Sequence, residues 1–337
     1  SFGGGNGGNA GYFTPVASFH YVHSVTSDFK LGVCAGSYFG LGLDYDDNWA
    51  GRYYFLEGVF LTFGIYPVAA YRINKWLSVG GGFSIVYSNY EARTAIRNLE
   101  PQSGDGRLKF EDSDLGYGGN AGVLVEPREG TRFGITYRSK VDLTYKDKPD
   151  LKGAGPLLTG ALNLLGLTGS KLELEMEIPR AAMASGYHEL TESLAIMGNV
   201  GWQDWSSFGN IDVSIDSDTS NGLTADLGYK DTWHFAFGAQ YRLAQPWLLS
   251  AGFAYDTSPA DSGKKRTPAL PLDRQIRVGT GVQYDWNDDV TLGTAYEFLD
   301  LGDGNINQSG GNLRGGLKGD YQKNHIHFLN VNVVWKF

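Results

Sequence analysis

Apolar and polar residues alternate along the last segment of the chain, residues 325–337. From position 329 onward the odd-numbered residues are all apolar, and the even-numbered ones are polar except for Val334. A period of two is typical of a β-strand that has one apolar and one polar face. A strand at the end of a chain must be paired on both sides or leave an open edge. We therefore expect this strand to belong to a closed barrel.

The same alternation recurs upstream, with large apolar residues on one parity and small or polar residues on the other. The clearest copies cover residues 29–43, 59–73, 77–87, 132–145 and 233–241. Strands of a transmembrane β-barrel have this pattern, because one face meets lipid and the other a polar lumen. Residues 171–187 follow it as far as Pro179, where the parity shifts as at a bulge. We count about thirteen strands and expect fourteen, with one before Ser1, because bacterial single-chain barrels have even numbers.

The connections between these segments alternate in length. Short turns lie at 26–28, 74–75, 126–130, 188–192, 244–246 and 287–289, with long polar loops between them. Outer-membrane barrels show this asymmetry, with short turns on the periplasmic side. Four tryptophans close to short turns or to the C-terminus are expected to form an aromatic girdle at that membrane boundary: Trp76, Trp247, Trp286 and Trp335.

Composition narrows the alternatives. The chain of 337 residues has 48 Gly, 20 Tyr and 8 Trp, which favours strands and turns over helices. No run of about 18 apolar residues is present, and the net charge of -9 argues against a nucleic-acid partner. A soluble all-β protein such as a propeller is the alternative, but its loops need not alternate in length. We predict a single transmembrane β-barrel over residues 1–337, with a flexible glycine-rich lead-in over 1–11.

One long connection, residues 149–170, is rich in leucine instead of polar residues. Leu158, Leu162 and Leu165 have the i, i+4, i+7 spacing of a short amphipathic helix, and Leu157 lies beside them. An apolar helix in an extracellular loop is a candidate landing site for an apolar ligand. Alternatively, these leucines pack on one another and contact no ligand.

Several basic residues fall on the lumen parity of their strands. Among them we single out Arg138, Lys140 and Arg277 as candidates to bind a ligand carboxylate through charge-assisted hydrogen bonds. The alternative is that they form ion pairs within the lumen. His325 and His327, two positions apart, could bind a metal but fit a membrane-boundary position better. We find no nucleophile motif, and Cys34 has no identified catalytic partner, so we expect no enzymatic activity.

Several stretches resemble the outer-membrane long-chain fatty-acid transport family, which also includes aromatic-hydrocarbon channels. They are YFGLGLDYDDNWAGRYY (38–54), YPVAAYRINKWLSVGGG (66–82), RFGITYRSKVDLTY (132–145), GNVGWQDWSSFGNI (198–211), SAGFAYDTSP (250–259) and RTPALPLDRQIRVGTG (266–281). Their order and spacing carry the resemblance. It implies a fourteen-stranded barrel with an N-terminal plug, but the Asn-Pro-Ala motif of that plug is absent from this sequence.

The resemblance further implies capture of the ligand in an outer apolar groove, transfer to a lumen site and sideways release through the wall. The family's lumen basic residue in the TYRS segment matches Arg138. We expect a channel for passive uptake of hydrophobic molecules, most of all long-chain fatty acids, in the bacterial outer membrane. An aromatic-hydrocarbon channel and a structural or adhesive barrel are the alternatives. We expect a monomer surrounded by lipid and lipopolysaccharide, with no cofactor and no metal.

Overall fold

The computed structural model describes residues 3–98, 100, 104–164, 169–216, 221–310 and 314–337. Thirteen antiparallel strands follow one another in its main sheet, which confirms the number counted from the sequence. In spatial order they are β1 (Phe19–Ser24), β2 (Phe29–Gly36), β4 (Glu57–Asn74), β5 (Leu77–Ile96), β6 (Gly106–Arg128), β7 (Thr131–Arg138), β11 (Ala181–Glu189), β12 (Leu194–Gln203), β15 (Thr232–Ala244), β16 (Trp247–Asp256), β17 (Gln275–Asp285), β18 (Val290–Asp300) and β21 (His325–Trp335).

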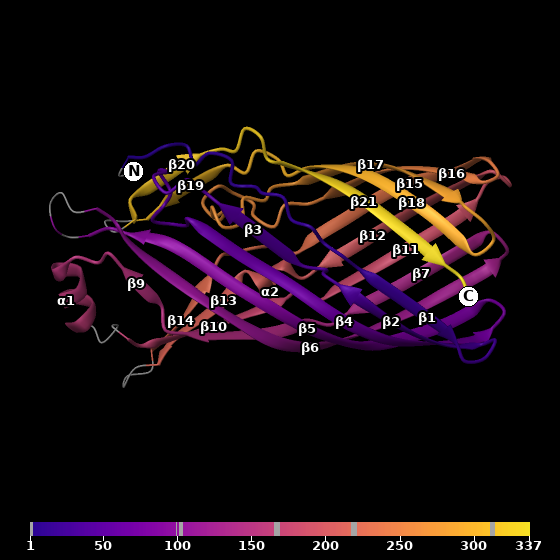
Figure 1. Ribbon diagram of the computed structural model, residues 1–337, viewed down its shortest axis with the longest axis horizontal. Helices are drawn as coiled ribbons and strands as arrows, with labels where there is room; N and C mark the ends of the chain where they lie inside the picture. Colours follow the sequence, from indigo (N-terminus) through magenta and orange to yellow (C-terminus); the bar gives the residue numbers. More distant parts are fainter. Residues whose placement is uncertain (1–2, 99, 101–103, 165–168, 217–220, 311–313) are drawn as a thin grey trace.

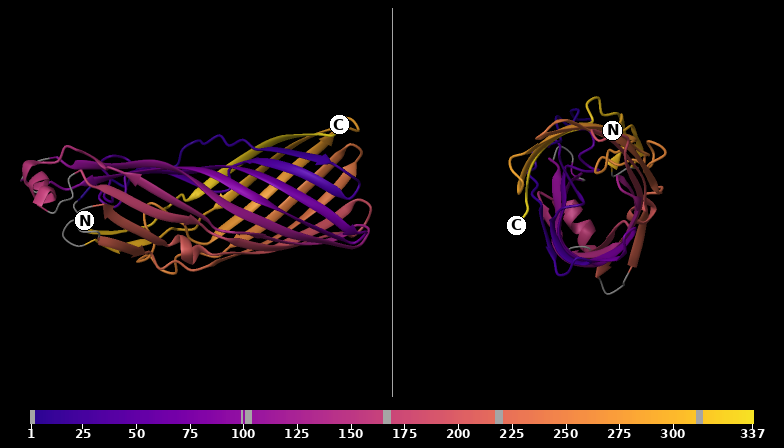
Figure 2. Two further views of the ribbon diagram at one scale, coloured as in Figure 1. Left: turned by 90° about the horizontal axis from the view of Figure 1, so that it is seen from below. Right: turned by 90° about the vertical axis from the view of Figure 1, so that its right-hand side faces the viewer.

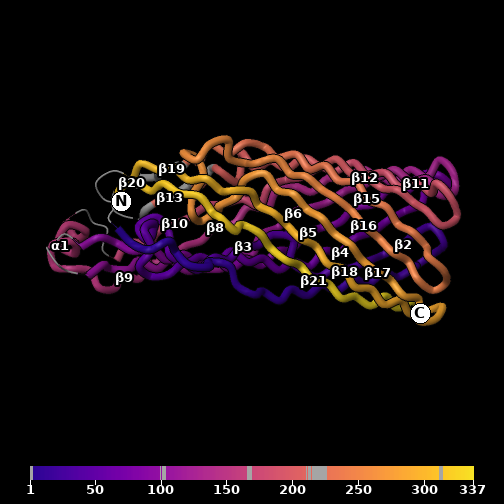
Figure 3. Tube along the Cα trace, turned by 90° about the horizontal axis from the view of Figure 1, so that it is seen from above, coloured from indigo at the N-terminus to yellow at the C-terminus, as the bar shows by residue number. Residues whose placement is uncertain are grey.

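The main sheet curls into an elongated barrel whose strands are tilted to its long axis (Figures 1 and 2). The two ends of the strand order, β1 and β21, lie on the same side of the barrel (Figure 3). The rings of Tyr21 and Phe337 stack there with centroids 5.9 Å apart. In the described part of the chain, β1 pairs only with β2 and β21 only with β18, so no backbone hydrogen bonds join these two edges.

The outward face of the barrel is apolar toward its short-turn end, as the alternation predicts. Exposed fractions in β21 and the residues after it reach 76% for Leu329 and 81% for Phe337. The four girdle tryptophans at 76, 247, 286 and 335 are all exposed near the short turns. Trp247 packs on Tyr284 with ring centroids 4.6 Å apart. A band of exposed apolar side chains with an aromatic border is what lipid contact requires of a barrel.

The remaining elements lie toward the long-loop end (Figure 1). A second antiparallel sheet contains, in order, β14 (Asn221–Asp226), β13 (Asn210–Asp216), β10 (Lys171–Ile178) and β8 (Val141–Asp147). The short strands β3 (Gly40–Asp44) and β9 (Asp150–Lys152) add to β4 and β6, and β19 (Ile306–Ser309) pairs with β20 (Gly316–Gly319). The helices are α1 (Pro156–Leu164) and α2 (Trp205–Phe208). No helix among the described residues is long and apolar enough to cross a membrane.

The wall changes face between β7 and β8. Phe133, Ile135 and Tyr137 are exposed, as predicted, but the expected outward position of residues 141, 143 and 145 is wrong. These three, Val141, Leu143 and Tyr145, are at most 5% exposed and join the interior apolar cluster. The break at residues 139–140 turns β8 relative to β7, so the parity inverts. A similar break at Pro179 and Arg180 separates β10 from β11, at the parity shift predicted from Pro179.

A further break interrupts the wall between β2 and β3 at residues 37–39. The sequence predicts one continuous strand over 29–43 with Phe39 outward. Instead Phe39 packs against Phe60 and Phe208 of the interior cluster, with ring centroids 5.5 and 5.4 Å away. The expectation for Phe39 is therefore wrong, because an interior aromatic cluster accepts an apolar side chain as readily as lipid does.

The glycine-rich residues 3–10 lie against the loop that follows β3. Backbone hydrogen bonds join Gly5 to Asn48 and Ala50, Asp46 to Gly7, and Asp44 to Ala10. Tyr45, which packs face to face with Trp49, donates from its hydroxyl to the Pro268 carbonyl at 2.9 Å. Residues 3–10, expected to be a flexible lead-in, are thus hydrogen-bonded to the loops at the open end of the barrel.

Candidate functional site

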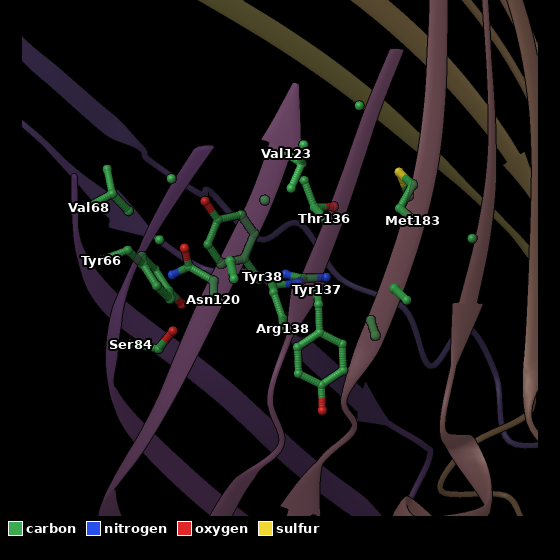
Figure 4. Close-up of a pocket in the computed structure, with 18 of the residues that line it drawn as sticks. Tyr38, Tyr66, Val68, Ser84, Asn120, Val123, Thr136, Tyr137, Arg138 and Met183 are labelled. Carbon is green, nitrogen blue, oxygen red and sulfur yellow. The ribbon is translucent and has the colours of Figure 1, made fainter. Parts of the chain in front are cut away.

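The described residues enclose a cavity of about 890 Å³ inside the barrel, which we call the lower cavity. Residues of β2, β4, β5, β6 and β7 supply much of its lining, and β11, β12, β15, β16, β17 and Tyr38 contribute the rest. Figure 4 shows Tyr38, Tyr66, Asn120 and Arg138 gathered on one side of this cavity, while Tyr137 points away from them. Most of the remaining lining is small or apolar, as at Val68 and Met183, so these polar groups form one polar side of the cavity.

Arg138 is the last residue of β7, immediately before the break that turns β8. Its cross-strand partner is Asn120 of β6. Its guanidinium lies over the ring of Tyr38, with Cζ 5.3 Å from the ring centroid, a cation–π contact. Among the described residues, no carboxylate forms an ion pair with Arg138. A positive charge that faces a cavity without an internal anion can accept an anionic ligand.

Tyr38 and Tyr66 pack edge to face beside this guanidinium, with ring centroids 4.7 Å apart. Tyr38 belongs to the wall break, and its hydroxyl lies 3.3 Å from Sγ of Cys34. The sequence analysis missed both tyrosines. The pair of glycines around residues 37–39, Gly36 and Gly40, was a signal that this strand is interrupted.

Arg277 also lines the lower cavity, but it already has partners. Its guanidinium contacts Asp256 at 3.2 Å and Glu297 at 3.4 Å, and Asp256 also binds His234 at 2.8 Å. This is the lumen ion-pair network that we considered as the alternative to a ligand role. A bound carboxylate would have to compete with two carboxylates that Arg277 already holds.

Lys140 lies outside the lining of both cavities. It follows the break at the end of β7, and its ammonium pairs with Asp142 at 2.9 Å and Glu177 at 3.0 Å on an exposed surface. The inverted parity of this part of the wall explains the position, because residues 141, 143 and 145 occupy the interior. The structure therefore does not bring Lys140 together with Arg138 and Arg277.

A second cavity of about 490 Å³, the upper cavity, adjoins the lower one toward the long-loop end. On β5 the lower cavity is lined by residues 78–81 and 84, and the upper one by Tyr90 and Glu91. The two share five lining residues, Tyr38, Gln203, Thr232, Asp256 and Arg277. Its lining is mostly apolar, and its aromatic members are Tyr38, Phe39, Phe55, Phe60, Tyr90, Trp205, Phe208, Tyr229 and Phe328. An apolar molecule could be desolvated in this upper cavity before it reaches Arg138.

Helix α1 carries the predicted leucines at the far end of the molecule (Figure 1). It buries none of its residues: Leu157 is exposed, and Leu158 and Leu162 are half-buried. Leu165 lies outside the described residues. The helix therefore presents apolar surface to solvent, at a distance from the two cavities.

The wall break at residues 37–39 borders an unpaired stretch beside the lower cavity. On one side β1 and β2 are paired up to Phe19 and Ala35, and on the other the Asp44 amide donates to the Ala10 carbonyl at 2.9 Å. Between these two points, residues 11–18 and 36–43 make no backbone hydrogen bonds with each other in the described structure. We call this unpaired stretch the wall window. Cys34 and Tyr38, at its margin, both line the lower cavity.

The histidines and the serine that could take part in metal or nucleophile chemistry have other partners in the described structure. No group of three His, Cys, Asp or Glu side chains within the described ranges is arranged to hold a metal ion. His325 and His327 have ring centroids 5.1 Å apart, and His327 bonds instead to the Tyr296 hydroxyl at 2.8 Å. The hydroxyl of Ser206 donates at 2.8 Å to Asp204, the N-cap residue of α2.

Solved structures share this fold. A Pseudomonas aeruginosa FadL homologue superposes with a TM-score of 0.84 at 20% identity, covering 98% of this chain and 79% of that one. The Pseudomonas putida toluene transporter TodX superposes with a TM-score of 0.63 at 16% identity, covering 84% of this chain and 81% of that one. At these identities the likeness concerns the fold alone.

Curated relatives are more similar in sequence. The long-chain fatty acid transport protein of Escherichia coli O6:H1 is 26% identical over 324 residues, which cover 88% of this chain and 72% of the relative. Outer membrane protein P1 of Haemophilus influenzae is 26% identical over 311 residues, covering 84% of this chain and 65% of the relative. The family model "Outer membrane protein transport protein (OMPP1/FadL/TodX)" matches residues 3–337. The chain therefore belongs to this family of outer-membrane transport barrels, whose members are channels for hydrophobic compounds and not enzymes.

Proposed function

We propose that this protein takes up long-chain fatty acids by passive diffusion across the bacterial outer membrane. The observation that carries the proposal is Arg138, which faces the lower cavity without a carboxylate partner among the described residues. A guanidinium offers two parallel donors to a carboxylate. The Escherichia coli relative, a long-chain fatty acid transport protein, agrees with this substrate class.

Capture begins at α1, whose exposed leucines supply an apolar surface at the extracellular end. From there the chain of the fatty acid enters the aromatic upper cavity, while its carboxylate moves on to Arg138. Burial of apolar surface drives these steps, at roughly 25 cal/mol per Å² removed from water.

Release occurs sideways through the wall window into the membrane. A route through a water-filled pore would expose the same apolar surface again, at the same free-energy cost per Å². The window lies next to the lower cavity, and its two edges, residues 11–18 and 36–43, make no backbone hydrogen bonds with each other in the described structure. We also propose that the barrel works as a monomer, with lipid and lipopolysaccharide around its apolar outer face.

A second candidate is an aromatic-hydrocarbon channel. The aromatic lining of the upper cavity favours it, because ring edges and faces of ligand and protein pack well against each other. TodX, a toluene transporter, shares the fold. Such a ligand has no charge, so it would not need Arg138. A purely structural or adhesive barrel would need neither Arg138 nor α1.

The test is uptake of a labelled long-chain fatty acid, an aromatic hydrocarbon and a small sugar by proteoliposomes that contain the protein. Fatty-acid uptake should fall about tenfold or more in Arg138→Ala, because a charge-assisted hydrogen-bond pair is lost. The matched control is Arg132→Ala on the same strand, whose guanidinium lies over the Tyr187 ring outside both cavities. Hydrocarbon uptake that is indifferent to both changes, with no fatty-acid uptake, would support the second candidate. Sugar uptake as fast as fatty-acid uptake would refute specific transport.

A further inference from the structure

We propose that the hydroxyl of Tyr66 is a second ligand-binding group of the Arg138 site, and that the two together select a monoanionic carboxylate. The inference rests on the proposed function, since it names the head group that this site takes. It assigns a specificity role to a side chain that the sequence analysis did not single out.

Tyr66 is held in place from three directions. It lies on β4 as the cross-strand partner of Cys34, and its side chain is one of those that line the lower cavity. Its ring lies along the strand over Gly64, where any Cβ would collide with the ring and hydroxyl. The ring of Tyr38 packs on its edge. Only 8% of Tyr66 is exposed, so its hydroxyl has little freedom to turn elsewhere.

The hydroxyl of Tyr66 has no hydrogen-bond partner among the described residues, unlike the neighbouring hydroxyl of Tyr38, which contacts Cys34. The Tyr66 hydroxyl is open to the cavity that its side chain lines, so it is available to donate a hydrogen bond to a ligand there. A ligand oxygen at Arg138 could accept that hydrogen bond, because both side chains line the same side of the cavity (Figure 4).

Asn120 adds a neutral donor to the same site. It faces Arg138 directly across the β6 and β7 pairing and lines the lower cavity. Within the described structure its side-chain amide makes no hydrogen bond to another residue. A carboxylate has two oxygens and about four acceptor positions, so it can bind the guanidinium on one side and still accept from neutral donors.

The charges around the lower cavity favour one negative charge on the ligand. Besides Arg138, its charged lining residues are Asp256 and Arg277, which pair with each other at 3.2 Å, and Arg277 has Glu297 as a further partner. Arg138 is thus the one cation of the described lining without an anion. A carboxylate matches that charge, whereas a doubly charged phosphate monoester would bring an uncompensated negative charge into a partly enclosed site.

The experiment measures binding of dodecanoate, dodecanol and dodecyl phosphate to the protein in lipid nanodiscs. Tyr66→Phe keeps the ring over Gly64 and removes only the hydroxyl, so the dissociation constant for dodecanoate should rise about tenfold. Binding of dodecanol, which brings no charged oxygen to Arg138, should change less than twofold. Tyr71→Phe, on the same strand but facing lipid, is the matched control and should change neither.

Unchanged dodecanoate binding in Tyr66→Phe would overturn the inference, and so would an equal loss for dodecanoate and dodecanol, which would indicate a packing effect. Dodecyl phosphate that binds as well as dodecanoate to the unaltered protein would overturn the selection of a monoanion. Failure of the proposed function looks different, because Arg138→Ala would then leave dodecanoate binding and uptake unchanged whatever Tyr66→Phe does.

Discussion

At the scale of single residues, the distinction between two lumen arginines depends on their partners. Arg277 shares its guanidinium with Asp256 and Glu297, whereas Arg138 has only the Tyr38 ring beside it. From sequence, parity places both side chains in the lumen and cannot separate them. The partners come from β16 and β18, the two strands that pair with β17, so their approach depends on the register of strand pairing, which parity alone does not give.

A buried tyrosine pair, Tyr45 and Tyr321, lies among the loops at the open end of the barrel and gives a prediction for a single side chain. The hydroxyls of Tyr45 and Tyr321 lie 2.7 Å apart, and burial raises the pKa of Tyr321 to about 12. In the unfolded loop the hydroxyl of Tyr321 would ionise near pH 10, whereas in the folded loop it stays neutral until about pH 12. The contribution of Tyr321 to folding stability is therefore fully present below pH 10 and is lost as the pH rises toward 12. A tyrosinate absorbance titration of the protein minus that of Tyr321→Phe should therefore show a midpoint near 12. A midpoint at 10 would contradict a buried Tyr321.

At the scale of elements, the alternation predicts strands well because half of each strand meets lipid and half meets a polar lumen. It fails at residues 37–39 and 141–145 for one physical reason. Phe39, Val141 and Leu143 are apolar residues that satisfy an interior cluster as well as they would satisfy lipid. Period-two patterning therefore identifies the strands of this barrel, but it does not reveal where the wall turns an apolar face inward. The breaks that shape the candidate site fall at those places.

The junction of β6 and β8 gives an element-scale prediction. Val141 and Leu143 of β8 pack into the space left by Gly116 on β6, where a Cβ would also press on the Asp142 carbonyl. Gly116→Ala should lower the free energy of unfolding by about 1–3 kcal/mol through overpacking. Gly119→Ala, on the same strand with room for a Cβ, should change it by less than about 0.5 kcal/mol. Urea unfolding of the refolded barrel in vesicles measures both, and equal values for the two variants would refute this packing.

At the scale of the whole molecule, the sites follow one another along the barrel axis. The apolar helix α1 lies at the far end, the aromatic upper cavity comes next, and the lower cavity with Arg138 adjoins the wall window. The sequence supports the barrel, the leucine helix and the arginine, but the window depends on an absence of pairing between residues 11–18 and 36–43. The sequence does not reveal this missing pairing, because residues 37–43 alternate as a paired strand would.

Closing the lower margin of the window tests whether release is lateral. Ser18 is the first residue beyond the β1 pairing, and a Cβ at Gly36 would lie 3.1 Å from its Cβ. A disulfide needs about 3.5–4.5 Å between these atoms, so the two strands must move apart slightly to form one. In a Cys34→Ser background, Ser18→Cys with Gly36→Cys should form a disulfide that narrows the window. Fatty-acid uptake by proteoliposomes should fall severalfold when this bond is oxidised and recover on reduction, whereas dodecanoate binding at Arg138 should persist in both states. Each single cysteine variant should transport equally with and without reductant. If the oxidised double variant transports as fast as the reduced one, the ligand leaves by another route and release through the window is refuted. Binding at Arg138 would not be affected by that outcome.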